Sequence, residues 1–384
     1  ATFAKAKAER RFVLLDGAAE WCHWCHVMEA ETYHDASVRK LLDERFVAAK
    51  VDIDARPDIA DRYADYGWPA TVIFSPDGEE IGKYRGYLSP SDFVEILRSV
   101  VSGEAAKEVA AERKRAAAAP REVGVGPATR ATSDVTARWT ALWLDDLFDE
   151  NQGGWGTRQK LPCGWNDEWA LRHGGRRGEE KLQKRALFTL AQQRRLLDPV
   201  WGGLYQYSIA ESGPSDWDSP HFEKLLAPNV LALSAYALAF ELTRDARWRE
   251  PAASIRRWLE AFMLGPDGAF FTTQDADLHA HEPDKEFVDG HRYYALNDAD
   301  RRARGVPRID RHVYARENGL AIAAYAQTAH ALGDVTALAI AKKAALRMIA
   351  THLPTKVSLP GAFTHGPADG PPEGTRHLAD NAAM

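Results

Sequence analysis

Residues 21–29 read WCHWCHVME and place Cys22 and Cys25 two residues apart, with a histidine directly after each cysteine. The preceding run RFVLLDG (11–17) is short and apolar, as expected for a buried strand, and the motif then opens a helix. The unpaired N–H groups and the positive end of a helix favour a cysteine thiolate over the thiol. The spacing therefore predicts a redox dithiol, in which Cys22 attacks as the thiolate and Cys25 is the resolving thiol.

Two other groups of residues fit this prediction. GWPAT (67–71) comes just before a strand-like run, at the place where a thioredoxin fold carries a cis-proline opposite its dithiol. A cis X–Pro bond is rare enough to be structural by intent, so we expect a cis Trp68–Pro69 bond, with Pro69 presenting backbone to the substrate. His23 and His26 are expected to tune the thiols. An apolar lip around the thiols is expected from Trp21, Trp24 and Trp68.

Three other interpretations of the cysteines stay open. Cys22-x-x-Cys25-His26 also matches the c-type haem attachment pattern, although haem would need a distal ligand and a mainly helical small domain. A zinc site would need a second pair of ligands at metal spacing, which Cys163 and the scattered histidines do not visibly supply. The cysteines could also be buried and inert. We favour the redox dithiol and predict no metal and no cofactor.

The first part of the chain alternates strand and helix signals. VAAKVDID (47–54), GWPATVIF (67–74) and EEIGKYRGY (79–87) read as strands, and the Ser-Pro-Asp-Gly turn between the last two predicts a hairpin. Ser89 can cap a final helix that has a proline at its first position and an apolar face. The order β-α-β-α-β-β-α predicts an α/β thioredoxin-like domain over residues 1–103.

The rest of the chain reads as nearly all helical. Alanine- and charge-rich residues followed by a Pro/Gly-rich stretch predict a linker over 104–131. Over 132–384, amphipathic stretches near 132–150, 180–197, 228–244, 247–263, 316–332 and 334–351 are separated by GGWG, WGGLYQY, GPDGAFF and LPGAFTHG. Helix pairs joined by glycine-aromatic loops favour an α/α toroid over a plain helical solenoid, because a solenoid does not need bulky aromatic residues in its loops.

Composition narrows the function classes. The 384 residues are 45% hydrophobic, so they can bury cores for two domains, and the net charge of −6 is spread along the chain. We expect no nucleic-acid partner, because the only dense basic cluster is short, and no membrane span. The chain starts at Ala1 without a signal-like stretch, so a targeting segment is expected to be absent from it. The compartment stays open, and we favour the cytoplasm.

The chain resembles the spermatogenesis-associated thioredoxin-like family over almost its whole length. The motifs that carry the resemblance are CHWCHVMEAETYHD, KVDIDARPDI, YGWPATVIF, GGWG, GGLYQYS, SPHFEKLL, GAFFTTQDAD and LADNAAM. The resemblance implies a thioredoxin-like domain joined to a six-hairpin-glycosidase-like toroid. It departs at Pro228, where an acidic residue is usual, and about four helix pairs are counted where a full toroid has about six. We therefore expect the C-terminal hairpins to be missing.

Sugar-processing toroids place carboxylates, histidines and aromatic side chains on the loops around their cavity. The cavity candidates implied here are Trp155, Tyr205, Tyr207, His221, Glu223, Asp275, Asp277, Glu317 and Asp380. Paired aspartates can act as general acid and base, although the two aspartates of QDAD could equally form an Asx turn. Glu223 and Glu317 could equally be helix-capping residues. Cys163 is interpreted as a lone buried thiol.

We predict thiol–disulfide exchange with a protein thiol or disulfide substrate as the activity. The alternative is a carbohydrate-active enzyme or sugar-binding protein, with carbohydrate in the helical cavity and a structural thioredoxin-like domain. A third class, an interaction scaffold without turnover, is also compatible with the sequence, because fold does not fix function.

Overall fold

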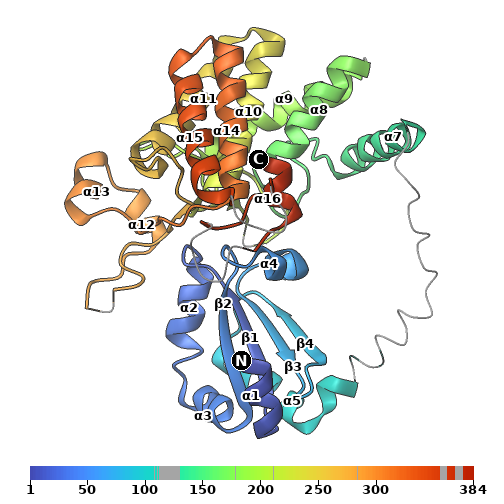
Figure 1. The fold of residues 1–384 in the computed structure, drawn as a ribbon, viewed down its shortest axis with the longest axis vertical. Coiled ribbons are helices and arrows are strands. Elements are labelled where there is room, and N and C mark those ends of the chain that lie inside the picture. Colours follow the sequence, from blue (N-terminus) through green and yellow to red (C-terminus); the bar gives the residue numbers. More distant parts are fainter. Residues whose placement is uncertain are drawn as a thin grey trace. The chain divides into compact units, whose positions relative to one another are not determined.

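The computed structural model describes residues 1–107, 109, 111, 130–177, 179–210, 212–282, 284–354, 361–367 and 375–384. It divides into two compact units, Ala1–Pro127 and Ala128–Met384 (Figure 1). Most of the predicted linker, at 108, 110 and 112–129, lies outside the described residues.

The N-terminal unit is built on a four-stranded sheet in the order β2-β1-β3-β4. Strand β1 pairs parallel with β2 and antiparallel with β3, and β3 pairs antiparallel with β4. Its elements are α1 (Thr2–Glu9), β1 (Phe12–Ala18), α2 (His23–Glu31), α3 (Ala36–Arg45), β2 (Phe46–Asp52), α4 (Pro57–Tyr63), η1 (Ala64–Tyr66), β3 (Ala70–Phe74), β4 (Glu80–Arg85) and α5 (Pro90–Ser102). The strands follow the order predicted from the sequence, but α1 precedes β1, and the single helical segment expected between the first two strands is two helices, α2 and α3.

Side-chain alternation along β1 divides the core between the two faces of the sheet. Leu14 packs with Met28 of α2 and Phe93 of α5 on one face, whereas Val13 and Leu15 pack on the other face with residues of α1 and α4. Successive side chains of a strand point to opposite faces, so Asp16 lies on the same face as Leu14, under α2.

The predicted turn between β3 and β4 and the predicted N-cap of α5 are confirmed. The segment Ser75–Gly78 forms the turn between β3 and β4, with the Gly78 N–H donating to the Ser75 carbonyl at 2.9 Å. The Ser89 hydroxyl caps α5 by accepting from the Asp92 N–H, and Gly103 ends the helix in a left-handed conformation.

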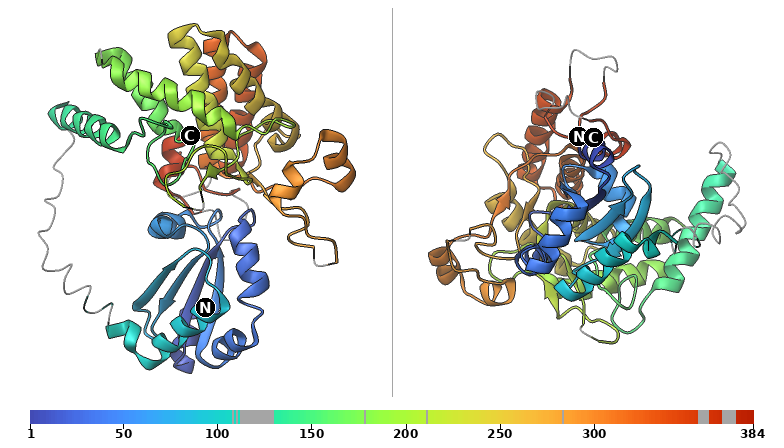
Figure 2. Two further views of the ribbon diagram at one scale, coloured as in Figure 1. Left: turned by 180° about the vertical axis from the view of Figure 1, so that it is seen from behind. Right: turned by 90° about the horizontal axis from the view of Figure 1, so that it is seen from below.

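The C-terminal unit is mainly helical (Figure 2). Its strands are two residues long and form one two-stranded sheet, β5-β6, and one three-stranded sheet, β7-β8-β9. Its longer helices are α7 (Arg130–Leu147), α8 (Gly164–Arg177), α9 (Glu180–Gln193), α10 (Leu226–Thr243), α11 (Arg249–Trp258), α14 (Ala315–Leu332) and α15 (Val335–His352). Its shorter elements are η2 (Arg194–Leu196), β5 (Tyr207–Ser208), β6 (Pro220–His221), β7 (Lys224–Leu225), η3 (Ala246–Trp248), η4 (Leu259–Met263), β8 (Thr273–Gln274), α12 (Gly290–Tyr294), α13 (Asp298–Arg304), β9 (Ile309–Asp310) and α16 (Leu378–Ala383).

Helix α10 differs from the predicted amphipathic helix over 228–244. Every residue from Ala232 to Ala239 is buried, because α10 packs against α8, α11 and α14 on different sides. In the described part of the chain it is the one helix long and apolar enough to cross a membrane by composition, and 61% of that stretch is buried inside the fold. It is therefore a core helix, and its apolar character follows from its central position.

The structure adds one long helix that the sequence analysis did not predict. Helix α8 follows the LPC phrase, and its sequence, GWNDEWALRHGGRR, lacks a clear helical pattern because it contains three glycines and many charges.

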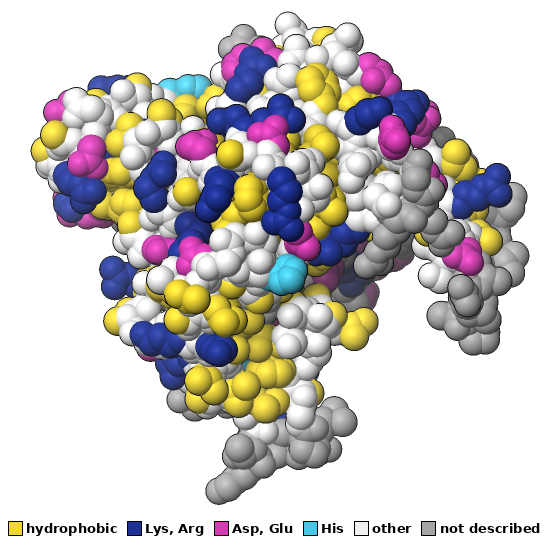
Figure 3. All heavy atoms as spheres, turned by 90° about the horizontal axis from the view of Figure 1, so that it is seen from above, with side chains coloured by type: hydrophobic (Ala, Val, Ile, Leu, Met, Phe, Trp, Pro, Cys, Tyr) yellow, Lys and Arg dark blue, Asp and Glu magenta, His cyan; other side chains and the backbone are white. Residues whose placement is uncertain are grey.

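Positive and negative side chains are interspersed on the face of the molecule drawn in Figure 3, as the scattered charges of the sequence predict.

Two of the glycine-aromatic loops each contain a buried ion pair between an aspartate and a lysine. Asp149 Oδ2 accepts from Lys160 Nζ at 2.6 Å, and Asp198 Oδ2 accepts from Lys224 Nζ at 2.7 Å. Each lysine also donates to a glycine carbonyl of its loop, that of Gly153 or Gly202. Because each lysine bonds to groups of its own loop, it stabilises the conformation of that loop.

Three loops are each held by an asparagine near the start of a helix, and the hydrogen bonds are the same in all three. Asn318 of α14 accepts from the Phe270 N–H at 2.8 Å and donates to the Phe270 carbonyl at 3.0 Å. Asn229 of α10 makes the same pair with Leu204, and Asn381 of α16 makes it with Phe363. This asparagine clasp recurs with the glycine-aromatic loops, and it positions Glu317 and Asp380, each directly before a clasp asparagine.

Candidate functional site

The CxxC segment forms a disulfide at the N-terminal end of α2. Cys22 and Cys25 are bonded through their sulfurs, with 5.2 Å between their Cα atoms, and both side chains are buried. Cys22 is the N-cap of the helix, and its Sγ accepts from the Cys25 N–H at 3.2 Å. An amide that donates to this sulfur stabilises negative charge on it, as a nucleophilic thiolate requires.

The predicted neighbours of the dithiol have defined partners. The His26 ring Nε2 lies 2.9 Å from the Glu20 carbonyl, which fixes that imidazole at the first turn of α2. Trp21 is buried and donates from Nε1 to Asp54 at 2.7 Å. Of the three tryptophans predicted to form an apolar lip, Trp24 is the exposed one, and Trp68 is half-buried.

The predicted cis Trp68–Pro69 bond is confirmed. The Pro69 carbonyl accepts from the Gly86 N–H at 2.9 Å, so the proline loop is tied to the segment after β4. Gly17 of β1 lies under the Trp68 ring, where an added Cβ would stand 2.9 Å from it.

Asp16 is a site residue that the sequence analysis missed. It is 9% exposed, and burial raises its pKa to about 6 against the opposing effect of Lys50. Because Asp16 faces α2, it is a buried carboxyl on the side of the sheet that carries this helix. An acidic residue at the end of the apolar run in RFVLLDG was the signal that could have identified it.

The cavity candidates of the helical unit lie in loops and helix starts. The rings of Tyr207 and His221 stack at 4.2 Å where β5 pairs with β6. Burial, together with the nearby Glu223 carboxylate, raises the pKa of Tyr207. These three residues form one polar-aromatic group.

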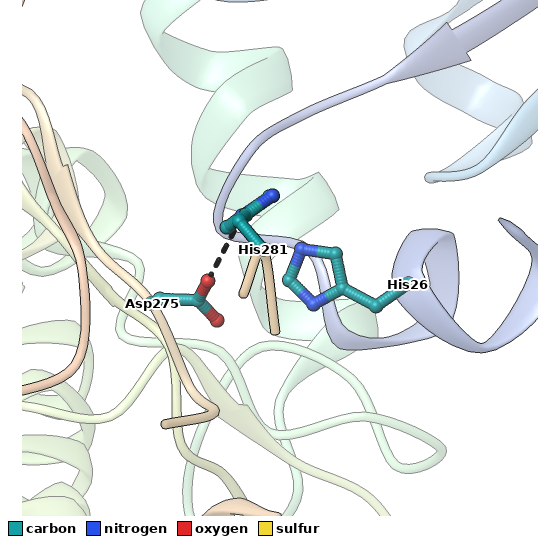
Figure 4. Close-up of side chains that lie close together, drawn as sticks. All are labelled: His26, Asp275 and His281. Carbon is teal, nitrogen blue, oxygen red and sulfur yellow. Dashed lines mark ion pairs between the residues drawn. The ribbon is translucent and has the colours of Figure 1, made fainter. Parts of the chain in front are cut away.

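Asp275 and Asp277 form the Asx turn that was the alternative to acid–base catalysis. The Asp277 N–H donates to Asp275 Oδ1 at 2.9 Å, and Asp277 Oδ1 accepts from the Gly290 N–H at 2.9 Å. Asp275 Oδ2 also lies 3.3 Å from His281 Nε2, an ion pair drawn as a dashed line in Figure 4. The two aspartates thus hold a loop, while one oxygen of Asp275 faces a histidine.

Glu317 and Asp380 are close enough to influence each other. Asp380 Oδ1 accepts from the Arg316 N–H and lies 3.0 Å from His365 Nδ1, whereas its Oδ2 has no hydrogen-bond partner among the described residues. Burial raises the pKa of Glu317, and the Asp380 charge adds to that rise. Glu317 Oε2 likewise has no hydrogen-bond partner in the described part of the chain. His365 was not predicted.

The remaining cavity candidates lie in packed surroundings. Trp155 packs edge-on against Phe148 and donates from Nε1 to the buried Asp167 at 2.8 Å. Tyr205 is buried, with Lys224 Nζ 5.4 Å from its ring centre. Cys163 is a free thiol, and its burial raises its pKa to about 12, which suits the predicted lone thiol.

Comparison with known proteins supports the resemblance deduced from the sequence. The family model described as "Thioredox_DsbH: Protein of unknown function, DUF255" matches residues 1–117. Human spermatogenesis-associated protein 20 is 28% identical over 303 residues, which cover 72% of this chain and 38% of that protein. The chain thus spans less than half the length of this curated relative.

Two further similarities are confined to parts of the chain. A protein disulfide-isomerase of Triticum aestivum is 32% identical over 111 residues, or 28% of this chain and 21% of that protein. A solved GH76 alpha-mannanase of Bacteroides thetaiotaomicron aligns with 61% of this chain and 58% of its own, at 15% identity and a TM-score of 0.45. The predicted thioredoxin-like fold of the N-terminal unit is confirmed.

Proposed function

We propose that this chain, a relative of spermatogenesis-associated protein 20 with a thioredoxin-like N-terminal unit, exchanges thiols and disulfides through Cys22 and Cys25. The observation that carries the proposal is the Cys22–Cys25 disulfide at the start of α2, where the Cys25 amide donates to Cys22 Sγ. A disulfide placed at a helix N-terminus is poised for exchange, because the same amides stabilise the thiolate left after reduction.

The proposed reaction has two exchange steps. The Cys22 thiolate attacks one sulfur of a substrate disulfide, which forms a mixed disulfide and releases the other substrate sulfur as a thiolate that takes up a proton. Cys25 then loses its proton and attacks Cys22 Sγ, which releases the second substrate thiol. Two electrons pass from the dithiol to the substrate, and a separate dithiol reductant must restore the reduced protein.

Asp16 is proposed as the group that takes the Cys25 proton in the second step. A carboxyl with a pKa of about 6 can accept a proton near neutral pH, and burial under α2 keeps bulk water from competing with it. The proposal therefore assigns attack to Cys22, resolution to Cys25 and proton transfer to Asp16.

A redox titration of the full chain tests the proposal. Thiol alkylation read by mass spectrometry across a dithiothreitol series is expected to give one two-electron transition, between roughly −270 and −120 mV. The Cys25→Ser variant should trap a mixed disulfide with a peptide substrate, whereas Cys22→Ser should not, and Cys163→Ser is the matched control that should behave as wild type. Thiols that never pair, or equal trapping by both variants, would contradict the proposal.

Carbohydrate binding by the helical unit is the second candidate function. Two buried carboxyl oxygens, Glu317 Oε2 and Asp380 Oδ2, have no hydrogen-bond partner among the described residues and supply acceptors that sugar hydroxyls can satisfy. Saturation-transfer NMR with D-glucose, D-mannose and N-acetylglucosamine should show contact that is lost in Glu317→Gln and kept in Glu180→Gln on the exposed start of α9. Contact with none of the three sugars, or contact kept in Glu317→Gln, would argue against this function.

A further inference from the structure

The N-terminal unit exposes one large aromatic side chain directly at its dithiol. Trp24 stands between Cys22 and Cys25 in the sequence and is 39% exposed. In the described part of this unit, the other exposed large apolar side chain is Phe3 of α1, whose ring packs edge-on against Phe74. Its exposed indole lies next to both cysteines in the sequence and is therefore placed where a bound substrate can contact it.

The Trp24 ring is supported on two sides. Its centre lies 5.7 Å from the Tyr87 ring and 5.3 Å from the His23 ring, which meets it edge-on. The Tyr87 hydroxyl donates to Glu31 Oε2 at 2.6 Å, at the far end of α2. The ring contact between Trp24 and Tyr87 thus places two aromatic rings beside the helix that carries the dithiol.

The backbone that carries Tyr87 is tied to the rest of the site. The Gly86 N–H donates to the carbonyl of Pro69, and the Thr32 hydroxyl donates to the carbonyl of Leu88 at 2.6 Å. The segment 86–88 is thus bonded to the proline loop before it and to the end of α2 after it. A surface fixed at both ends loses little conformational entropy when a ligand binds to it.

We propose that Trp24 and Tyr87 form an aromatic shelf that selects protein disulfides in which an aromatic residue flanks the cysteine. The proposal rests on the proposed thiol–disulfide exchange and names its substrate class. A substrate sulfur bonded to Cys22 places its neighbouring side chain within reach of the residue between the two cysteines. Two aromatic rings offer offset or edge-on contacts to a third ring, and such pairs favour binding beyond the area that they bury.

Three peptide probes test the shelf in the reduced full chain. Each is a mixed disulfide with glutathione: Gly-Phe-Cys-Gly, Gly-Cys-Phe-Gly and Gly-Gly-Cys-Gly, with blocked ends. We expect the wild type to reduce at least one phenylalanine peptide about fivefold faster than the glycine peptide. The ratio of two rates cancels any change in the potential of the dithiol, because the same dithiol acts on both peptides.

Variants separate the shelf from the reaction. Trp24→Ala and Tyr87→Ala should each reduce the ratio to about one, and Tyr87 lies outside the CxxC motif, so its variant leaves both cysteines and their spacing in place. Tyr87→Phe should keep the ratio, and Phe3→Ala is the matched control for loss of an exposed ring. Equal rates for all three peptides in the wild type, or a ratio that survives both alanine variants, would overturn the shelf. Reduction of none of the peptides would instead contradict the exchange activity itself.

Discussion

Replacement of Asp16 by asparagine is expected to stabilise the N-terminal unit at neutral pH and to leave it unchanged in acid. Burial raises the pKa of this carboxyl from 3.8 to about 6, a shift of about two units. At 1.36 kcal/mol per unit, the buried carboxylate destabilises the folded unit by about 3 kcal/mol once it is ionised. Asparagine has nearly the same shape and never ionises, so it removes this penalty.

The sign of the pH dependence follows from the raised pKa. Below about pH 3 the carboxyl is protonated in the folded and the unfolded chain, and the two proteins should be equally stable. Between about pH 4 and 6 the unfolded chain ionises while the folded unit keeps its proton, so the wild type loses stability relative to Asp16→Asn. Above about pH 6 the full difference remains.

Hydrogen exchange of the β1 and β3 amides in the oxidised full chain measures this difference in the unit that contains Asp16. Comparison of variant and wild type at the same pH removes the intrinsic pH dependence of exchange. Asp77→Asn, on the exposed turn between β3 and β4, removes the same formal charge and is the matched control. Equal protection of wild type and Asp16→Asn at pH 7.5, or a gain of the same size at pH 4 and pH 7.5, would refute the reasoning.

Two further predictions concern the helical unit. Asp198→Ala leaves the buried Lys224 and Arg301 without their shared carboxylate and should lower the free energy of unfolding by about 3–5 kcal/mol, as measured by thermal unfolding. Asp267→Ala breaks an exposed ion pair and should lower it by about 1 kcal/mol at most. Similar losses in the two variants would show that the buried ion pairs do not stabilise the fold. Gly202→Ala would drive a Cβ into the Ser254 carbonyl and should cost at least about 3 kcal/mol, while Gly213→Ala, with a similar positive φ and open space around it, should cost about 1–2 kcal/mol. Equal denaturation midpoints for the two alanine variants would contradict this steric argument.

Much of the fold could be predicted because local patterns agree with the tertiary structure. Three confirmed features depend on residues close in the sequence: the cis Trp68–Pro69 bond, the turn at Ser75 and the helix cap at Ser89. Helix α8 was missed because its glycines and charges mask a helix that is stabilised by packing against α9 and α10. The amphipathic pattern expected for α10 was wrong for the same kind of reason, since a helix surrounded by others has no polar face.

In the candidate site, too, local sequence patterns predicted some residues, whereas residues with distant partners could not be predicted. Cys22 and Cys25 could be assigned because their spacing, strand and helix are contiguous. The role of Asp16 depends on which face of β1 it occupies and on the helix above that face, and the pair of His365 with Asp380 joins segments that no local pattern connects. Residues that act through distant partners thus needed the structure.

The asparagine clasp separates the position of a loop from its chemistry. Asn229, Asn318 and Asn381 bind only backbone N–H and carbonyl groups, which every residue except proline offers. The clasp itself therefore sets no requirement on the side chain of the residue that it binds. A substitution on the exposed side of such a loop changes the surface while the clasp keeps the backbone in place, whereas a substitution that meets packed backbone, as at Gly202, does not have this freedom.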